Sequence, residues 1–236
     1  MSERVLGIAH RAGNEPTLLS AALAAGADIA EADVWPYRGQ LEVRHLKTMG
    51  PVPVLWDRWK LASAWAPRRI VAELLDHLPR GMGVMFDLKG HDRAGARALA
   101  DIVGYLAYEH RLYVCARDWA MLEPFEGSGA VVVYSAGTAK ELNQLLPIVD
   151  SGRCTAVSVH QKLLTPELAL RLHLGAHTVI TWAVNEPTRM RELVRWGVNG
   201  ITTDNLAVID AIRADAAIPR ADDALLATAS ADPRTG

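Results

Sequence analysis

The sequence predicts an α/β protein that folds as a closed (β/α)8 TIM barrel with a β-hairpin and loop insertion after its second strand. The chain has 236 residues, half of them hydrophobic, which is close to the roughly 250 residues of such a barrel. Short apolar runs alternate with helix-length segments that end at glycine, a pattern typical of parallel strands joined by helices. Polar residues follow these apolar runs, where parallel α/β folds place their chemistry. A doubly wound open sheet is the alternative architecture.

The eight expected strands are the apolar runs of the alternating pattern. They lie at residues 5–9, 27–34, 83–87, 112–116, 130–134, 156–159, 178–184 and 200–203. We expect the first helix to follow Thr17 as its cap and to end at Gly26. Another helix begins at Thr165, where a capping residue precedes proline and glutamate. The remaining helices are expected at residues 67–78, 93–110, 138–149 and 186–196.

The insertion begins with a reverse turn after the second strand. Residues 36–39, Pro-Tyr-Arg-Gly, are typical of a hairpin, so we expect the segment that ends at His45 to return over the barrel mouth. Residues 46–66 are rich in Pro and Trp. A loop of this length inside a compact domain is typically a lid or a binding loop.

Composition excludes several classes of protein. The formal net charge is −2 and no block of five or more Lys or Arg occurs, so we expect no nucleic-acid partner. Because no apolar stretch reaches about 18 residues and the first residues lack a signal-peptide pattern, we expect a cytoplasmic protein with no stable membrane insertion. The oligomeric state is left open.

We expect residues 1–212 to form a single barrel domain. Residues 213–236 have little to bury and are expected to be a disordered C-terminal tail. Cys115 and Cys154 have no metal-type spacing, so both are expected to be buried thiols.

Three carboxylates are the candidate metal ligands. Glu31 and Asp33 lie two positions apart at the end of the second strand, so their side chains point to the same face. Asp87 ends the next strand of the barrel. Adjacent carboxylates repel each other unless a positive charge lies between them.

Cationic and imidazole side chains follow the same strand ends. His10 and Arg11 come after the first strand, His45 follows the hairpin, and Lys89 lies two residues beyond Asp87. A single His or acid in such a place is more often a packing, capping or surface residue. The recurrence of these groups after each apolar run favours an active site instead.

Four further polar residues lie near the same edge. His160 and Gln161 end the sixth strand and are weaker candidates for substrate contact, and Glu15 is a candidate accessory ligand. We expect Asp204 to cap or brace the last loop.

The order of these motifs resembles the glycerophosphodiester phosphodiesterase family over roughly residues 5–210. The resemblance rests on the following motifs of this chain: His10-Arg11, Glu31-x-Asp33, His45, Asp87-x-Lys89, Thr181-Trp182-Ala183-Val184-Asn185 and Gly197-Val198-Asn199-Gly200-Ile201-Thr202-Thr203-Asp204. It implies a metal-dependent phosphodiesterase that hydrolyses glycerophosphodiesters to an alcohol and glycerol phosphate.

The resemblance also implies a role for each candidate. The divalent cation, Mg²⁺ or Ca²⁺, is held by Glu31, Asp33 and Asp87, and hard cations of this kind prefer oxygen ligands. His10 is the general base and His45 the general acid. Arg11 and Lys89 contact the phosphate, and Trp182 contacts the alcohol. The nucleophile is either water or a neighbouring hydroxyl of the substrate, which would give a cyclic phosphate first.

The chain departs from the family pattern in four places, and in one of them Asn14-Glu15-Pro16-Thr17 stands where Pro-Glu-Asn-Thr is usual. Ala12 separates His-Arg from the glycine that usually follows, Leu46 stands where Asp normally follows the second histidine, and Asp87 replaces a Glu. These departures motivate one alternative, a catalytically weak barrel that binds a phosphate ligand or a partner protein. A second alternative, motivated by the Trp-rich segment, is a phosphodiesterase that acts on lysophospholipid-type headgroups.

Overall fold

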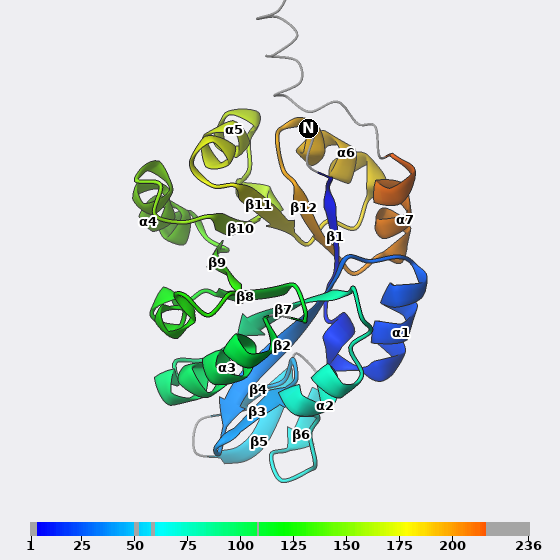
Figure 1. The fold of residues 1–236 in the computed structure, drawn as a ribbon, viewed down its shortest axis with the longest axis vertical. Helices are drawn as coiled ribbons and strands as arrows, with labels where there is room; N and C mark the ends of the chain where they lie inside the picture. The colour runs from blue at the N-terminus through cyan, green and yellow to red at the C-terminus, as the bar shows by residue number, and fades with distance from the viewer. Residues whose placement is uncertain (1–3, 50–51, 58–59, 108, 216–236) are drawn as a thin grey trace, which may run out of the picture.

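The structure, a computed structural model, describes residues 4–49, 52–57, 60–107 and 109–215. Eight parallel strands form a ring (Figure 1), and the pairing of the first with the second along the chain closes it. In sheet order they are β1 (Leu6–Ala9), β12 (Gly200–Thr203), β11 (Thr178–Trp182), β10 (Ala156–His160), β9 (Val131–Ala136), β8 (Leu112–Ala116), β7 (Gly83–Leu88) and β2 (Ile29–Tyr37). The predicted TIM barrel is confirmed, and the open sheet is excluded.

Helices surround the barrel, as Figure 1 shows. They are α1 (Pro16–Ala24), α2 (Val71–Asp76), α3 (Arg93–Leu106), α4 (Ala139–Asp150), α5 (Pro166–Gly175), α6 (Pro187–Arg195) and α7 (Leu206–Ala214). The predicted cap of the first helix is wrong: Glu15 is the N-cap and Pro16 the first helical residue, a position where the missing N–H of proline costs nothing. Two short 3-10 turns, Trp119–Met121 and Glu123–Phe125, stand between β8 and β9 in place of an α-helix.

The core has an inner and an outer layer. Side chains inside the barrel include Ile8, Ile29, Met85 and Ile180, all at most 3% exposed. The outer layer lies between the strands and the helices. Because side chains two positions apart on a strand share a face, the residues two positions beyond these inner ones also point into the barrel mouth.

The predicted hairpin is confirmed. β2 pairs antiparallel with β3 (Gln40–Val43), and Tyr37 lies opposite Gln40 across a two-residue turn. Both turn residues, Arg38 and Gly39, have positive φ, as the hairpin turn that matches strand twist requires.

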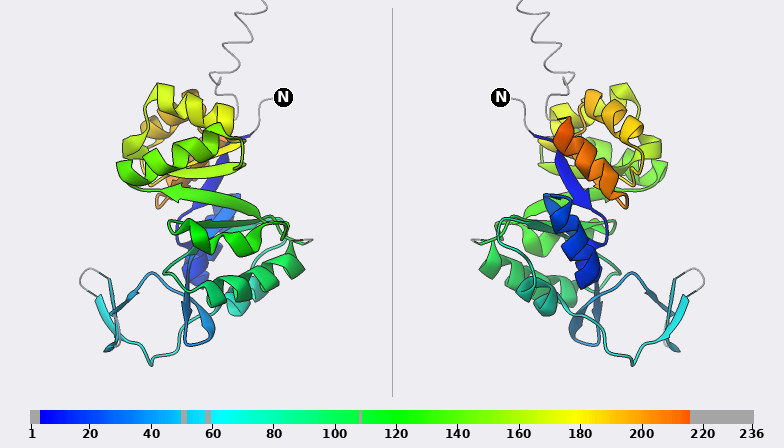
Figure 2. Two further views of the ribbon diagram at one scale, coloured as in Figure 1. Left: turned by 90° about the vertical axis from the view of Figure 1, so that its left-hand side faces the viewer. Right: turned by 90° about the vertical axis from the view of Figure 1, so that its right-hand side faces the viewer.

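Residues 46–66 are not the irregular loop that we expected. Their described part forms a small antiparallel sheet of β4 (Lys47–Met49), β5 (Val52–Asp57) and β6 (Lys60–Ser63), which projects from the barrel (Figure 2). β-branched and aromatic residues of β5 favour a strand. Pro51 and Pro53 interrupt this pattern in the sequence, and proline favours a loop over a strand.

The C-terminal boundary also differs from the prediction. α7 continues past residue 212, and Asp215 accepts a 2.5 Å hydrogen bond from Arg191. The rest of the expected tail, residues 216–236, lies outside the described residues. No helix in the described ranges is long and apolar enough to cross a membrane. Cys115 and Cys154 are both free and buried, as expected.

Candidate active site

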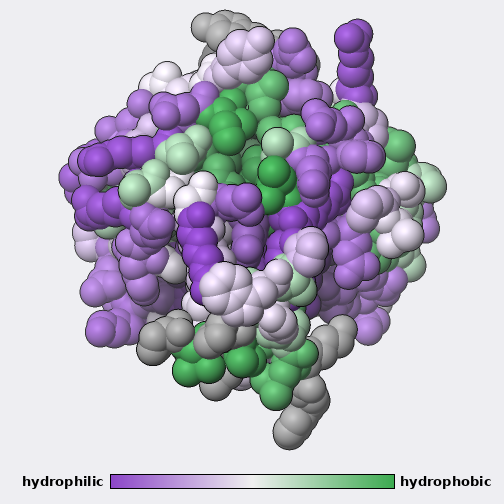
Figure 3. All heavy atoms as spheres, turned by 90° about the horizontal axis from the view of Figure 1, so that it is seen from below, coloured by the Kyte–Doolittle hydropathy of each residue, from purple (hydrophilic) through white to green (hydrophobic). Residues whose placement is uncertain are grey.

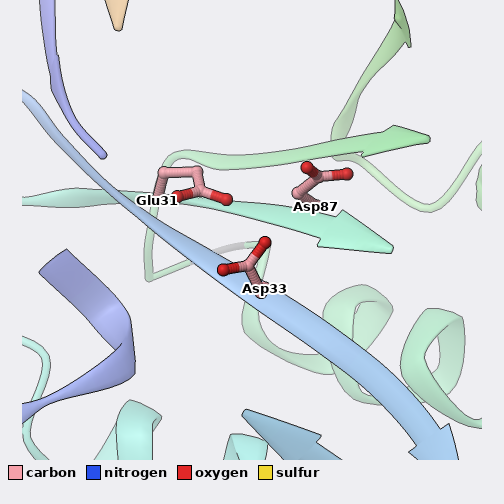
Figure 4. A group of neighbouring side chains, drawn as sticks. All are labelled: Glu31, Asp33 and Asp87. Atoms are coloured by element: carbon pink, nitrogen blue, oxygen red, sulfur yellow. The ribbon is translucent and has the colours of Figure 1, made fainter. Parts of the chain in front are cut away.

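The three candidate ligands meet at the mouth of the barrel. Glu31 and Asp33 follow the interior residue Ile29 on β2 at two-residue steps, so both point inward. Asp87 lies directly beside Asp33 in the pairing of β2 with β7. One carboxylate oxygen of each residue lies within 4.8 Å of the other two (Figure 4). The structure therefore brings together carboxylates that the sequence placed on two different strands.

Burial and mutual repulsion perturb these carboxylates. Burial, reinforced by the charge of Asp33, raises the pKa of Glu31 to about 8. Burial also raises the pKa of Asp87. For Asp33 burial acts in the same direction, but Lys89 and a hydrogen bond from Asn14 outweigh it and lower the pKa.

Lys89 supplies the positive charge that this cluster requires. Its Nζ lies 2.9 Å from Asp33 Oδ1 and also pairs with Asp87. Burial alone would lower the pKa of this ammonium, but the neighbouring carboxylates raise it. The Lys89 ammonium therefore opposes the effect of burial on both acids, and for Asp33 it contributes to a lowered pKa.

The donor set fits a divalent cation. Oxygen ligands from three carboxylates suit Mg²⁺ or Ca²⁺. Glu31 Oε1 is buried and has no hydrogen-bond partner among the described residues, whereas Oε2 accepts a 2.6 Å bond from the backbone N–H of Arg11. A buried carboxylate oxygen without a partner is costly, and a cation in this place would satisfy it.

A tight turn after β1 holds Arg11 and Asn14 against β2. Arg11 has φ 57°, a left-handed conformation that is uncommon for a residue with a side chain. A Cβ on Gly13 would lie 2.7 Å from Ala32 Cβ, so only glycine allows this close approach. Asn14 then exchanges two hydrogen bonds with Asp33, donating at 2.9 Å from its side chain and accepting at 3.0 Å.

His10 is paired with an acid from the last strand of the barrel. Its Nδ1 lies 2.7 Å from Asp204 Oδ1, and its Nε2 lies 3.9 Å from Glu31 Oε2. Burial lowers the pKa of His10, but Asp204 and Glu31 outweigh it, so the pKa is raised. The hydrogen bond with His10 lowers the pKa of Asp204.

Asp204 therefore does more than brace the last loop, which was our expectation. Its backbone N–H does donate to Asn185 Oδ1 at 2.9 Å, but its carboxylate faces His10. The closed ring explains this contact, because β12 pairs with β1 and their ends are adjacent.

Both ring nitrogens of His45 have a hydrogen-bond partner. Its Nδ1 lies 2.8 Å from Asp57 Oδ2, and its Nε2 lies 2.8 Å from Arg11 Nη2. Guanidinium is always a donor, so Nε2 is the acceptor and the proton of a neutral His45 is on Nδ1. Asp57 comes from β5, and sequence reasoning missed it because that segment was expected to be a loop.

The remaining candidates lie across the mouth. Trp182 follows the interior residue Ile180 on β11, nearly opposite β2 and β7 in the ring. Its ring packs edge-on against His160, with 4.7 Å between centroids. Gln161 donates to the carbonyl of Ala183. Trp182 thus faces the acidic cluster from the opposite wall, with His160 and Gln161 beside it.

A cavity of about 660 Å³ opens beside His45. Arg11, Asn14 and His45 line its polar side. Its other lining residues include five apolar ones: Leu18, Val43, Leu46, Leu61 and Ala62. Glu15 also lines this cavity and is not part of the acidic group that the described residues form.

Residues 178–207 match the model of the Glycerophosphoryl diester phosphodiesterase family. This range contains β11, β12 and the segment that carries Trp182, Asn185 and Asp204. No curated protein matches the chain.

Solved structures share the whole fold. A protein of Silicibacter pomeroyi described as a glycerophosphoryl diester phosphodiesterase is 20% identical with a TM-score of 0.71, covering 93% of this chain and 96% of its own. The glycerophosphodiester phosphodiesterase of Thermotoga maritima is 16% identical with a TM-score of 0.69, covering 91% and 99%. A phosphodiesterase of Oleispira antarctica, solved with the product sn-glycerol-3-phosphate, is 16% identical with a TM-score of 0.69, covering 88% and 96%. At these identities the likeness establishes the fold.

Proposed function

We propose that the chain is a member of the glycerophosphodiester phosphodiesterase family, whose model matches residues 178–207, and that it hydrolyses glycerophosphodiesters to an alcohol and glycerol phosphate with a divalent cation and two histidines. The observation that carries this proposal is the arrangement of His10 and His45, each paired with a carboxylate, around one acidic cluster. Phosphodiester hydrolysis needs a proton acceptor, a proton donor and positive charge near the phosphate.

Glu31, Asp33 and Asp87 would hold the cation, Mg²⁺ or Ca²⁺. When bound, such an ion stabilises the negative charge that develops on the phosphoryl oxygens. The Lys89 ammonium lies on the same carboxylates, and a cation there would release it toward the substrate. Lys89 then contacts the phosphate as a point charge, whereas Arg11 binds two oxygens through its planar fork.

His10 acts as the general base in this mechanism. Asp204 holds the proton on Nδ1 and leaves Nε2 free to accept one from the nucleophile. The negative charges of Asp204 and Glu31, which raise the pKa of His10, also stabilise the imidazolium that forms.

His45 acts as the general acid, and Arg11 controls when it is protonated. Arg11 occupies Nε2 in the structure, so His45 takes up a proton there only after Arg11 has turned to the phosphate. Asp57, on Nδ1, then stabilises the imidazolium. His45 donates the Nε2 proton to the departing alcohol, which leaves poorly as an alkoxide. Trp182 provides the aromatic wall for that alcohol.

Hydrolysis of a panel of glycerophosphodiesters tests this function. We expect turnover that EDTA abolishes and that Mg²⁺ or Ca²⁺ restores, and a loss of about 10²- to 10⁴-fold in His10→Ala and His45→Ala. Folded protein without turnover under any cation would favour the alternative, a weak barrel that binds a phosphate ligand or a partner.

The apolar wall of the cavity favours a second candidate, hydrolysis of lysophospholipid-type diesters. The acyl chain of such a substrate would lie along Leu18, Leu46, Leu61 and Ala62 while its phosphate reaches Arg11. The test compares kcat/KM for a lysophospholipid below its micellar concentration with that for its deacylated counterpart. Equal values would exclude this candidate. Under either candidate we propose a role in lipid metabolism, and the cytoplasmic location stays a prediction.

A further inference from the structure

The small sheet of β4, β5 and β6 has two unlike faces. Residues directly opposite each other in an antiparallel pair point to the same side. Leu55, which is 1% exposed, and Asp57, which contacts His45, point toward the barrel. Trp56, the residue between them, points to the other side together with its partners Lys47 and Leu61.

We call this second side the outer face. It presents Lys47, Val52, Trp56 and Leu61, and Trp65 follows just after β6. The exposed fractions of the apolar ones are high: 74% for Leu61, 71% for Trp65, 50% for Val52 and 38% for Trp56. Figure 2 shows the sheet projecting from the barrel, and Figure 3 shows an apolar patch at the lower edge of the view from below. Large apolar side chains gathered on a projecting element mark an interaction surface.

Cationic side chains accompany the aromatic ones. The Arg38 guanidinium carbon lies 3.8 Å from the ring centroid of Trp65, and Lys47 Nζ lies 5.6 Å from that of Trp56. Residues 36–70 contain seven Lys and Arg and only two Asp and Glu, a formal charge of +5 in a chain whose net charge is −2. The segment that carries the outer face therefore has a net positive charge, whereas the rest of the chain has a net negative one.

We propose that the outer face docks on an anionic phospholipid surface. Tryptophan rings, apolar side chains and flanking Lys or Arg are the combination that binds the boundary between headgroups and acyl chains. Each basic residue near such a surface contributes roughly 1 kcal/mol. The exposed cations Arg38 and Lys47 beside Trp65 and Trp56, in a segment of net positive charge, complement anionic headgroups and would repel a second copy of the same face. The partner is thus a lipid surface rather than another copy of this chain.

Docking in this way places the active-site cavity beside the lipid. Trp56 on the outer face and Asp57, which contacts His45, are consecutive residues of β5. Leu61 belongs to the outer face and also lines the cavity. A diester that leaves the lipid surface therefore has a short apolar path to Arg11 and His45.

Sedimentation with vesicles tests the proposal without reference to catalysis. The full chain is mixed with phosphatidylcholine vesicles that contain or lack phosphatidylglycerol, at low salt and at about 1 M salt, where charges are screened beyond about 3 Å. We expect binding to the anionic vesicles and loss of most of it at high salt. Leu61→Asp should weaken binding at least about tenfold, because it removes an apolar contact and adds a repelled charge.

Leu174→Asp is the matched control, since Leu174 is 79% exposed and lies on α5, at the opposite end of the molecule from the sheet in Figure 1. It should bind as the unmodified chain does, and circular dichroism checks that both variants are folded. Failure of the unmodified chain to bind anionic vesicles, or equal losses in the two variants, would overturn the proposal. A dimer in sedimentation velocity that Leu61→Asp dissociates would also overturn it by assigning the face to a second copy.

Discussion

Asp57→Asn should separate proton donation from substrate binding. The substitution keeps the size of the side chain but removes the charge that lies 2.8 Å from His45 Nδ1. An asparagine amide can also donate to Nδ1, which would move the proton of neutral His45 to Nε2. In that tautomer Nε2 carries a proton that faces the Arg11 N–H, so His45 could no longer accept a hydrogen bond from Arg11.

The expected loss of activity follows from the hydrogen bond between Asp57 and His45. A hydrogen bond to a charged group contributes about 1.5–3 kcal/mol, and both side chains are largely shielded from water, with 31% and 26% exposed. If the bond acts on the imidazolium, that energy corresponds to a fall in kcat of about 10- to 150-fold. KM should stay within about twofold, because in this account Asp57 does not touch the substrate and Arg11 has already turned from His45 to the phosphate when the substrate is bound.

The leaving group provides the decisive assay. A glycerophosphodiester with an alkyl alcohol needs protonation of that alcohol, whereas a p-nitrophenyl ester does not. Asp57→Asn should therefore slow hydrolysis of the alkyl diester by about 10- to 150-fold and hydrolysis of the p-nitrophenyl ester by less than about threefold. Asp101→Asn, which removes an exposed carboxylate from α3, is the control and should slow neither. Equal losses on both substrates would refute the assignment of Asp57 as the residue that positions the acid.

Three other predictions concern the charges around the cluster. Asp204→Asn should lower the pKa of His10 in an NMR titration, because it removes the hydrogen bond and the negative charge that raise it; an unchanged pKa would contradict the pairing. Lys89→Met should destabilise the metal-free protein by about 2 kcal/mol in urea unfolding, since it leaves carboxylates without their cation, and Mg²⁺ or Ca²⁺ should restore part of the loss. Metal affinity should rise about tenfold per pH unit below about 8, because Glu31, with a pKa of about 8, is protonated at lower pH and the metal must displace that proton; calorimetry in two buffers measures the proton released, and none would count against Glu31 as a ligand.

The barrel was predictable because its strands depend on local patterns. The runs at residues 112–116 and 200–203 are apolar, short and bounded by turns, and both strands have the expected bounds. The meeting of Glu31, Asp33 and Asp87 followed from the same pattern, because parallel strands present their carboxyl ends at one edge of the barrel.

The partners of the histidines were not predictable in this way. Asp57 contacts His45 only because residues 52–57 form a strand of a second sheet, and Asp204 contacts His10 only because the ring closes between β12 and β1. Both contacts depend on how distant elements are placed in space. The close approach of Gly13 to β2, which brings Asn14 to Asp33, is of the same kind.

The most direct test of the central claim is the release of glycerol phosphate from a glycerophosphodiester by metal-stripped protein. We predict no release after EDTA treatment, full release when Mg²⁺ or Ca²⁺ is returned, and almost none from His10→Ala with the same cation present. Release that persists in EDTA, or a His10→Ala variant as active as the unmodified chain, would contradict a mechanism that combines a cation with histidine catalysis.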